Sequence, residues 1–152
     1  MRLEGNKAFP TSPTATDDLI TNPDAISRAM PGLKELRLVS ENAYEARMEV
    51  GVAGIKGVYD GSLEMADIAP GESYRLLVKG EGPMGFMDAD VSISLAAAED
   101  GGTSVSYAGD AKVGGTVAGV GQRMLSGVAK LIINQFFNAL VKEAKSIAKE
   151  GQ

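Results

Sequence analysis

The sequence contains no cysteine and no histidine among its 152 residues. Without cysteine the chain has no disulfide, no thiolate nucleophile and no cysteine-bound zinc. Without histidine it lacks the commonest general base and the commonest metal ligand in proteins. These two absences exclude Ser-His-Asp and Cys-His mechanisms within the chain.

Basic clusters and long apolar runs are also missing. The net charge is −5 and no run of Lys or Arg occurs, which argues against binding to nucleic acid phosphates. The N-terminus has no apolar stretch of the kind found in signal peptides. The most apolar segment, residues 117–141, is interrupted by Gln122, Arg123, Lys130, Asn134 and Gln135. We therefore expect a cytoplasmic protein without a membrane span.

The first thirty residues contain one strand and two helix starts. Residues 2–9 are predicted to form a strand that stops at Pro10. Ser12-Pro13 and Asn22-Pro23 each place a capping side chain directly before a proline, the usual sign of a first helical turn. The second helix is expected to end at Met30-Pro31-Gly32, since proline cannot continue it.

From residue 36 to residue 113 apolar and polar side chains alternate. This period of two predicts strands, and turn signals such as Ser40-Glu41-Asn42 and Asp100-Gly101-Gly102 separate them. We predict an antiparallel meander with one apolar face.

The last segment, residues 117–148, repeats its apolar residues at helical spacing and predicts one long helix across that face. The order strand, two short helices, meander and long helix predicts an α+β helix-grip fold. It has a curved antiparallel sheet of six or seven strands wrapped on the C-terminal helix. No linker interrupts residues 1–152, so we expect a single domain.

Two short motifs have structural interpretations. Residues 80–85 fit G-x-G-x-x-G, but a strand pattern follows instead of the helix that a dinucleotide needs, so a hairpin turn is predicted. Asp88 and Asp90 share one face of a strand, where they could approach a metal ion. Because Ala89 and Val91 alternate with them, we expect both carboxylates to lie in solvent.

Glycines at the inward positions Gly57, Gly61, Gly80 and Gly109 lack side chains where a filled core would have them. Bulges or tight bends explain individual glycines equally well, but together they favour a cavity beneath the helix. Gly119, Gly121 and Gly127 either allow close packing of the helix or thin its wall above a ligand. The expected cavity lining is Met48, Val50, Tyr59, Gly61, Leu63, Leu76, Ile93, Tyr107, Met124 and Val128.

Several segments together resemble the CoxG family, named for the G subunit of carbon monoxide dehydrogenase. They are Asn22-Pro23 with Met30-Pro31-Gly32, Gly54-Ile55-Lys56-Gly57 with Tyr59-Asp60-Gly61, Gly85-Phe86, Gly114-Gly115-Thr116-Val117-Ala118 with Gly121-Gln122-Arg123, and Gln135-Phe136-Phe137. The resemblance implies the polyketide cyclase and lipid-transfer-like (SRPBCC) superfamily and its hydrophobic cavity. It carries no catalytic residues over. Many members have a cysteine where this chain has Met30.

The resemblance implies a non-catalytic accessory protein for a molybdenum-containing carbon monoxide dehydrogenase-type enzyme. Such a protein would carry an apolar electron acceptor, a quinone- or lipid-like molecule, or recruit the enzyme to the inner face of the membrane. No covalent cofactor is expected. Some members have a membrane-seeking tail after the helix, so stable anchoring is not expected of a chain that stops at Gln152. Two alternatives remain: a cyclase- or hydratase-like enzyme, which needs an inward acid or base, and a co-chaperone-like module, which needs an exposed apolar patch.

Overall fold

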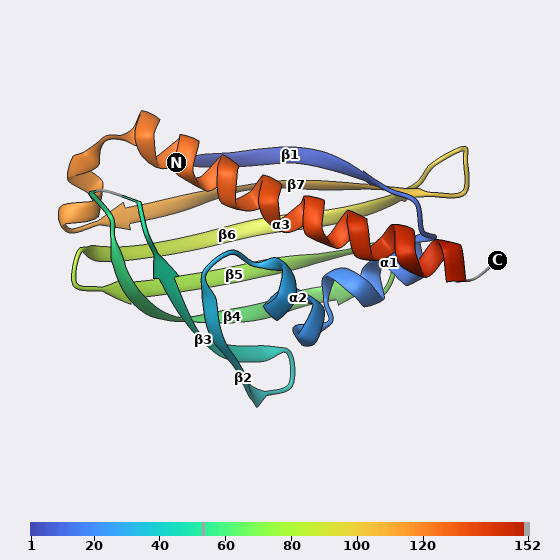
Figure 1. Cartoon of the computed structure of the whole chain (residues 1–152), viewed down its shortest axis with the longest axis horizontal. Coiled ribbons are helices and arrows are strands. Elements are labelled where there is room, and N and C mark those ends of the chain that lie inside the picture. Colours follow the sequence, from blue (N-terminus) through green and yellow to red (C-terminus); the bar gives the residue numbers. More distant parts are fainter. Residues whose placement is uncertain (53, 151–152) are drawn as a thin grey trace.

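Seven antiparallel strands form one sheet in the computed structural model, which describes residues 1–52 and 54–150 (Figure 1). The strands are β1 (Arg2–Phe9), β2 (Leu33–Ser40), β3 (Ala43–Val50), β4 (Gly57–Ala69), β5 (Ser73–Gly82), β6 (Gly85–Ala97) and β7 (Thr103–Gly114). Their order across the sheet is β1-β7-β6-β5-β4-β3-β2. The meander is therefore confirmed, and β1 joins it beside the last strand.

Two short helices follow β1, α1 (Pro13–Ile20) and α2 (Pro23–Ala29). The Ser12 hydroxyl accepts a hydrogen bond from the backbone N–H of Ala15 at 3.2 Å. The Asn22 side chain accepts one from the N–H of Asp24 at 2.8 Å. Both helices begin where the cap-and-proline pattern predicts, because each cap satisfies backbone donors that the first turn leaves unpaired.

The C-terminal helix begins later than its apolar spacing predicts. Residues 116–120 form a 3-10 turn, η1 (Thr116–Val120), and Gly121 follows with φ of 98°. That backbone conformation is accessible to glycine and breaks the helical path. Helix α3 (Gln122–Glu150) then runs for 29 residues, about 43 Å at 1.5 Å per residue, across the front of the sheet (Figure 1).

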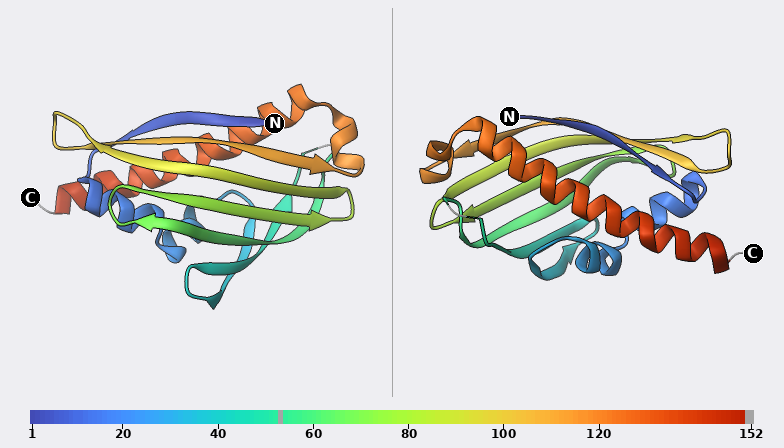
Figure 2. Two further views of the ribbon diagram at one scale, coloured as in Figure 1. Left: turned by 180° about the vertical axis from the view of Figure 1, so that it is seen from behind. Right: turned by 45° about the horizontal axis from the view of Figure 1, so that its top comes forward.

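The two halves of α3 pack differently. Its C-terminal half carries the closest packing, with Leu140 and Ala144 at 0% exposure against α1, α2 and the sheet. Seen from behind, the opposite face of the sheet has no helix over it (Figure 2). Helix α3 also packs along β1 and on η1, while Met48 and Val50 of β3 stay half-buried. A less crowded space therefore lies beneath the first half of the helix.

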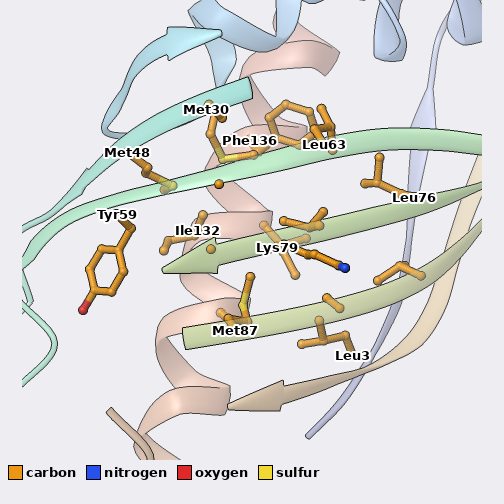
Figure 3. Close-up of a pocket in the computed structure, with 18 of the residues that line it drawn as sticks. Leu3, Met30, Met48, Tyr59, Leu63, Leu76, Lys79, Met87, Ile132 and Phe136 are labelled. Carbon is orange, nitrogen blue, oxygen red and sulfur yellow. The ribbon is translucent and has the colours of Figure 1, made fainter. Parts of the chain in front are cut away.

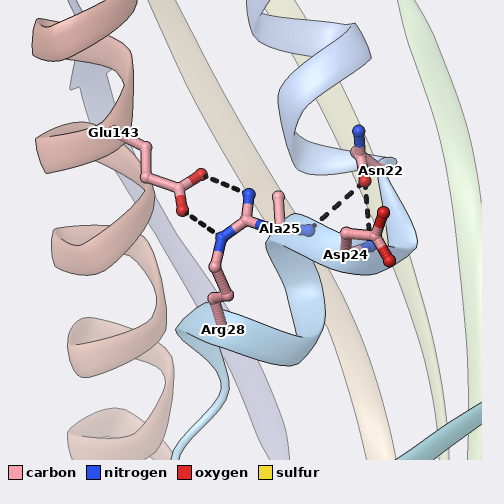
Figure 4. A network of polar contacts seen from close by, with 5 residues as sticks. All are labelled: Asn22, Asp24, Ala25, Arg28 and Glu143. Atoms are coloured by element: carbon pink, nitrogen blue, oxygen red, sulfur yellow. Dashed lines mark hydrogen bonds and ion pairs between the residues drawn. The ribbon is translucent and has the colours of Figure 1, made fainter.

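An ion pair ties α2 to the second half of α3. The Arg28 Nε donates to Glu143 Oε1 at 2.7 Å and the Nη2 donates to Oε2 at 3.3 Å (Figure 4). The hydrogen bond to Glu143 raises the pKa of Arg28 above its ordinary value. The pair is exposed to solvent, so it fixes the orientation of the two helices more than it adds to stability.

The hairpin and aspartate predictions are both confirmed. Gly80 to Gly85 join β5 to β6 through a turn at Pro83 and Met84. Asp88 and Asp90 are exposed on the outer face, where Asp90 pairs with the guanidinium of Arg75. That guanidinium also contacts the carboxylate of Asp67 at 3.0 Å.

Candidate ligand cavity

A cavity of about 410 Å³ lies between the concave face of the sheet, α2 and the first half of α3 (Figure 3). It falls within the range of about 300–1,000 Å³ that is usual for small-molecule sites. All seven strands contribute to the floor, and α3 supplies the opposite wall through Leu125, Val128, Ala129, Ile132, Ile133, Phe136 and Phe137.

The wall of the cavity is almost entirely apolar. Three methionines on different elements, Met30, Met48 and Met87, reach into it (Figure 3). Unbranched, polarisable thioethers adapt to ligands of different outline. The arrangement suits burial of a hydrocarbon or ring surface and offers little to a charged substrate.

The cavity is partly open to solvent, so water can occupy it when no ligand is bound. Water gains few hydrogen bonds from an almost wholly apolar wall. An apolar ligand that displaces this water would bury the wall and its own surface together. The geometry therefore suits an apolar ligand.

Three phenols lie on the wall, and each has a distinct setting. The Tyr59 hydroxyl donates to the backbone carbonyl of Ile55 at 2.5 Å. The Tyr107 ring stacks on Phe137, with centroids 5.6 Å apart, and it covers the backbone of Gly5 on the neighbouring strand. Tyr74 is buried near Asp17.

Burial raises the pKa of all three phenols, and the negative charge of Asp17 adds to the effect at Tyr74. A phenol whose pKa lies above its usual value of about 10 stays protonated at neutral pH. The Tyr59 hydrogen is already donated to the carbonyl of Ile55, so only Tyr74 and Tyr107 have a hydroxyl hydrogen left for a ligand carbonyl. They are poorly matched to acid–base catalysis near pH 7.

Nine of the ten residues proposed from the sequence line this cavity: Met48, Val50, Tyr59, Gly61, Leu63, Leu76, Ile93, Tyr107 and Val128. Whether they bind a ligand stays a prediction. The tenth, Met124, was placed wrongly, because it is 41% exposed and lies off the wall. At 100° per residue it lies about 40° from Val128 and about 80–140° from Leu125, Ala129 and Ile132, so it stands at the edge of the lining face.

Sequence reasoning missed part of the wall. Leu3 on β1, Met30 after α2, Leu33 and Leu36 on β2, and Phe136 on α3 all line the cavity. Leu3 shares a face of its strand with the apolar Phe9, which would have placed it inward, and the helical spacing from Leu125 would have found Phe136. No comparable signal marks Met30, since it lies where the chain leaves α2.

The inward glycines do not all leave space. A Cβ at Gly80 would have no atom within 4 Å, so this position does open the cavity. At Gly61 a Cβ would lie 1.8 Å from the carbonyl oxygen of Lys79, and at Gly109 it would lie 2.1 Å from that of Asp90. These two glycines serve the close approach of neighbouring strands where the sheet bends.

The glycines near α3 neither thin its inner wall nor serve close packing. Gly119, Gly121 and Gly127 are absent from the cavity lining, and a Cβ at each would have no atom within 4 Å. Gly121 breaks the helical path before α3. Both interpretations of these glycines from the sequence were therefore wrong.

Helix α3 has the length and mean hydropathy of a membrane span over Gln122–Lys149, with a value of 1.4 in its most apolar window. Only 11% of that window is buried, because one side faces the cavity and the other faces solvent. Met124 and Leu131 are exposed on the outer side. The polar residues within α3 therefore do not lower its mean hydropathy below that of a membrane span. One face of the same helix lines the cavity.

Across residues 1–52 and 54–150 no group of three or more acidic side chains comes together in a way that could hold a metal ion. No buried polar side-chain atom in that part of the chain lacks a hydrogen-bond partner. The recognisable chemistry of the site is therefore apolar burial, with three tyrosines at its wall.

The CoxG family, described as the G subunit of carbon monoxide dehydrogenase, matches residues 5–145. The chain belongs to this family. A solved structure of a conserved protein from Geobacillus kaustophilus is 38% identical to this CoxG-family chain, with a TM-score of 0.92 and 96% of each chain covered. No curated protein matches the chain.

More distant structures share the fold of this CoxG member. A START superfamily protein from Mycobacterium smegmatis has a TM-score of 0.76 at 11% identity, covering 96% of this chain and 98% of its own. The protein TTHA0849 from Thermus thermophilus has a TM-score of 0.72 at 12% identity, covering 97% of this chain and 99% of its own. The helix-grip architecture predicted for the CoxG resemblance is thereby confirmed.

Proposed function

We propose that the protein is a non-catalytic carrier that binds an apolar, quinone- or lipid-like molecule in the cavity beneath α3. The observation that carries the proposal is a space of about 410 Å³ with an almost wholly apolar wall. Burying apolar ligand surface there is worth about 25 cal/mol per Å² before the cost of ordering the ligand. Membership of the CoxG family supports an accessory role.

A quinone fits the polar features of the wall as well as its apolar area. Its ring and side chain would occupy the apolar space, and a carbonyl oxygen would accept a hydrogen bond from a wall phenol such as Tyr74. A fatty acyl chain would use the same space without that bond. The family name supports a carbon monoxide dehydrogenase-type enzyme as the partner that exchanges electrons with the bound molecule.

A transient contact with the inner membrane face completes the proposal. The outer side of α3 exposes Met124 and Leu131, and Lys142, Lys145 and Lys149 lie toward its end. Apolar side chains followed by lysines suit the surface of an anionic bilayer. Sedimentation with anionic and neutral vesicles tests this part, and a protein that pellets with neither kind of vesicle would remove it.

The central test is ligand identification. Native mass spectrometry of protein purified without detergent should show a bound apolar species, and a titration should then measure affinity with 2-decyl-1,4-benzoquinone. The chain has four tyrosines and no tryptophan. Three of these tyrosines line the cavity, so a bound quinone should quench most of the intrinsic emission.

An enzyme of the same fold predicts a different result. Tyr59→Phe and Tyr107→Phe should leave quinone binding nearly intact, since the rings keep their apolar area. A cyclase or hydratase that used a phenol as its acid would lose turnover in one of them. Detecting catalysed conversion of a bound compound that disappears in these variants would replace the carrier proposal.

A further inference from the structure

The cavity extends furthest along strand β5. Every second residue of this strand lines it in turn: Tyr74, Leu76, Val78 and Gly80. The path from the first of these residues to the last is about 20 Å along the strand, at roughly 3.3 Å per residue. The neighbouring strand β6 lines the cavity over a similar length, from Met87 to Ile93. The space is therefore elongated in the direction of these two strands.

The two ends of this elongated space are built differently. At the Tyr74 end the wall is densely packed, since Tyr74, Met65 and Ile93 are each no more than 7% exposed. At the other end Gly80 and its register partner Met87 are only half-buried. The Tyr74 end is therefore the narrower of the two, and the Gly80 end has more room.

The narrow end also carries the hydrogen-bond donor that is best placed for a ligand. The Tyr59 hydroxyl is already bonded to the carbonyl of Ile55. The Tyr107 hydroxyl lies over Gly5 at the edge of the sheet, where a Cβ on that glycine would be 2.6 Å away from it. Tyr74 lines the cavity and keeps its hydroxyl hydrogen for a ligand. A ligand group that accepts a hydrogen bond therefore fits beside Tyr74.

Gly80 leaves the backbone bare at the roomier end. Its register partner on β4 is Gly61, which pairs in turn with Ala46 on β3, so three adjacent strands carry no side chain larger than a methyl group there. At Gly61 the close approach of the Lys79 carbonyl explains the glycine. A Cβ at Gly80 would have no atom within 4 Å, so the described neighbours do not require glycine at this position. Glycine inside a strand also marks places where a ligand approaches the backbone.

We infer that the ligand is an elongated molecule that lies along β5, with a hydrogen-bond-accepting head beside Tyr74 and the end of its apolar chain over Gly80. The inference rests on the carrier proposal, since it concerns the same cavity. Gly80 is then a specificity-determining residue, because the bare backbone there admits the end of the chain. The distance from Tyr74 to Gly80 sets the length of chain that is fully buried, and a shorter chain buries less apolar area.

Two quinones that differ only in chain length test the inference. The ring and chain of 2-decyl-1,4-benzoquinone together match the distance from Tyr74 to Gly80, whereas 2-butyl-1,4-benzoquinone covers roughly half of it. The wild-type protein should bind the decyl compound at least about a hundredfold more tightly, because each further buried methylene removes apolar area from water. Quenching of tyrosine emission measures both affinities.

Gly80→Val obstructs the place of the chain end and leaves the place of the head unchanged. The strand should tolerate the change, because a Cβ there meets no atom within 4 Å and valine favours strands. The decyl quinone should bind at least about tenfold more weakly, and the butyl quinone should stay within about threefold of its wild-type affinity. Gly119→Val is the matched control, since Gly119 is outside the cavity lining and a Cβ there also meets no atom within 4 Å. It should bind both quinones as the wild type does.

Tyr74→Phe tests the place of the head. It removes the hydroxyl and keeps the ring, so both quinones should bind roughly fivefold more weakly, by similar factors. If Tyr74→Phe leaves both affinities unchanged, the head does not lie beside Tyr74 and the inference fails.

The variants at position 80 give the second criterion. If Gly80→Val weakens both quinones equally, or neither of them, the chain does not end over Gly80 and the inference is overturned. Urea unfolding of the same samples checks the fold. Should valine disturb the sheet, Gly80→Ala repeats the test with one methyl group, and it should weaken only the decyl quinone, by about threefold. A wild-type protein that binds neither quinone would instead remove the carrier proposal itself.

Discussion

The ring of Tyr107 on β7 stacks on the ring of Phe137 on α3, with centroids 5.6 Å apart and planes 21° apart. Phe137 also meets Phe9 edge-on at 6.3 Å. This pair joins the helix to the sheet at the point where the dense core of the C-terminal half gives way to the cavity. The aromatic contacts thus keep α3 in place above a space that its own first half does not fill.

Phe137→Ala should lower the free energy of unfolding by about 3–5 kcal/mol, the usual loss for a buried phenylalanine. The side chain is 7% exposed and contacts three other aromatic rings. Leu131→Ala is the control on the same helix, because Leu131 is 54% exposed and should change stability by no more than about 0.5 kcal/mol. Urea unfolding followed by circular dichroism measures both. Similar losses in the two variants would show that α3 is not anchored through Phe137.

Val128→Asp should weaken binding of 2-decyl-1,4-benzoquinone by more than about tenfold, because a carboxylate on an apolar wall loses hydration without gaining a partner. Val128 faces the cavity from α3. Leu131→Asp places the same charge on the solvent side of the helix and should bind as the wild type does. Tyrosine quenching titrations provide the affinities. Gly61→Glu would be a poor test, since its Cβ would meet the Lys79 carbonyl at 1.8 Å and disturb the sheet.

The fold could be predicted from local patterns because each pattern has one structural solution. The alternation of apolar and polar residues over 36–113 matches the period of a strand and not that of a helix. The capping residues Ser12 and Asn22 mark where the two short helices begin. Inward strand positions such as Met48 and Ile93 followed directly from that alternation.

What the sequence could not supply depends on relations between distant segments. Val128 lines the cavity, whereas Met124, one turn earlier on nearly the same stripe of α3, is exposed, and apolar spacing alone did not separate the two. The close approach of the Lys79 carbonyl to Gly61 could not be predicted either. In a sequence, a glycine that leaves space in a cavity cannot be distinguished from a glycine that avoids a clash with a neighbouring strand. The break at Gly121 was missed because the apolar spacing continues across it.

Stability should fall as the pH rises above about 10, and Tyr74 should account for a measurable part of that fall. Its pKa is raised in the folded state by burial and by the charge of Asp17. Below pH 10 the phenol is protonated in both states and contributes no pH dependence. Above it the unfolded chain releases the proton first, so the free energy of unfolding decreases by up to about 1.4 kcal/mol per pH unit.

The measurement is urea unfolding at pH 8 and at pH 11, compared with Tyr74→Phe. Removing the phenol should make the decrease between the two pH values smaller, whereas Tyr44→Phe should keep the wild-type decrease. An identical pH dependence in Tyr74→Phe and the wild type would mean that Tyr74 is hydrated in the folded protein, which contradicts its 6% exposure.

Two glycines on opposite sides of the molecule should respond to alanine with opposite signs. Gly127 lies within α3, and a Cβ there would have no neighbour within 4 Å. Gly127→Ala should therefore raise the free energy of unfolding by about 1 kcal/mol, because alanine loses less backbone entropy in a helix. Gly109→Ala should lower it, since a Cβ would lie 2.1 Å from the Asp90 carbonyl and 2.6 Å from the Val91 Cα. Thermal unfolding of both variants, with ligand affinity measured alongside, separates backbone effects from cavity effects. If Gly127→Ala instead impaired quinone binding, the outer side of α3 would take part in holding the ligand, and the cavity boundary drawn from Val128 and Ile132 would have to include it.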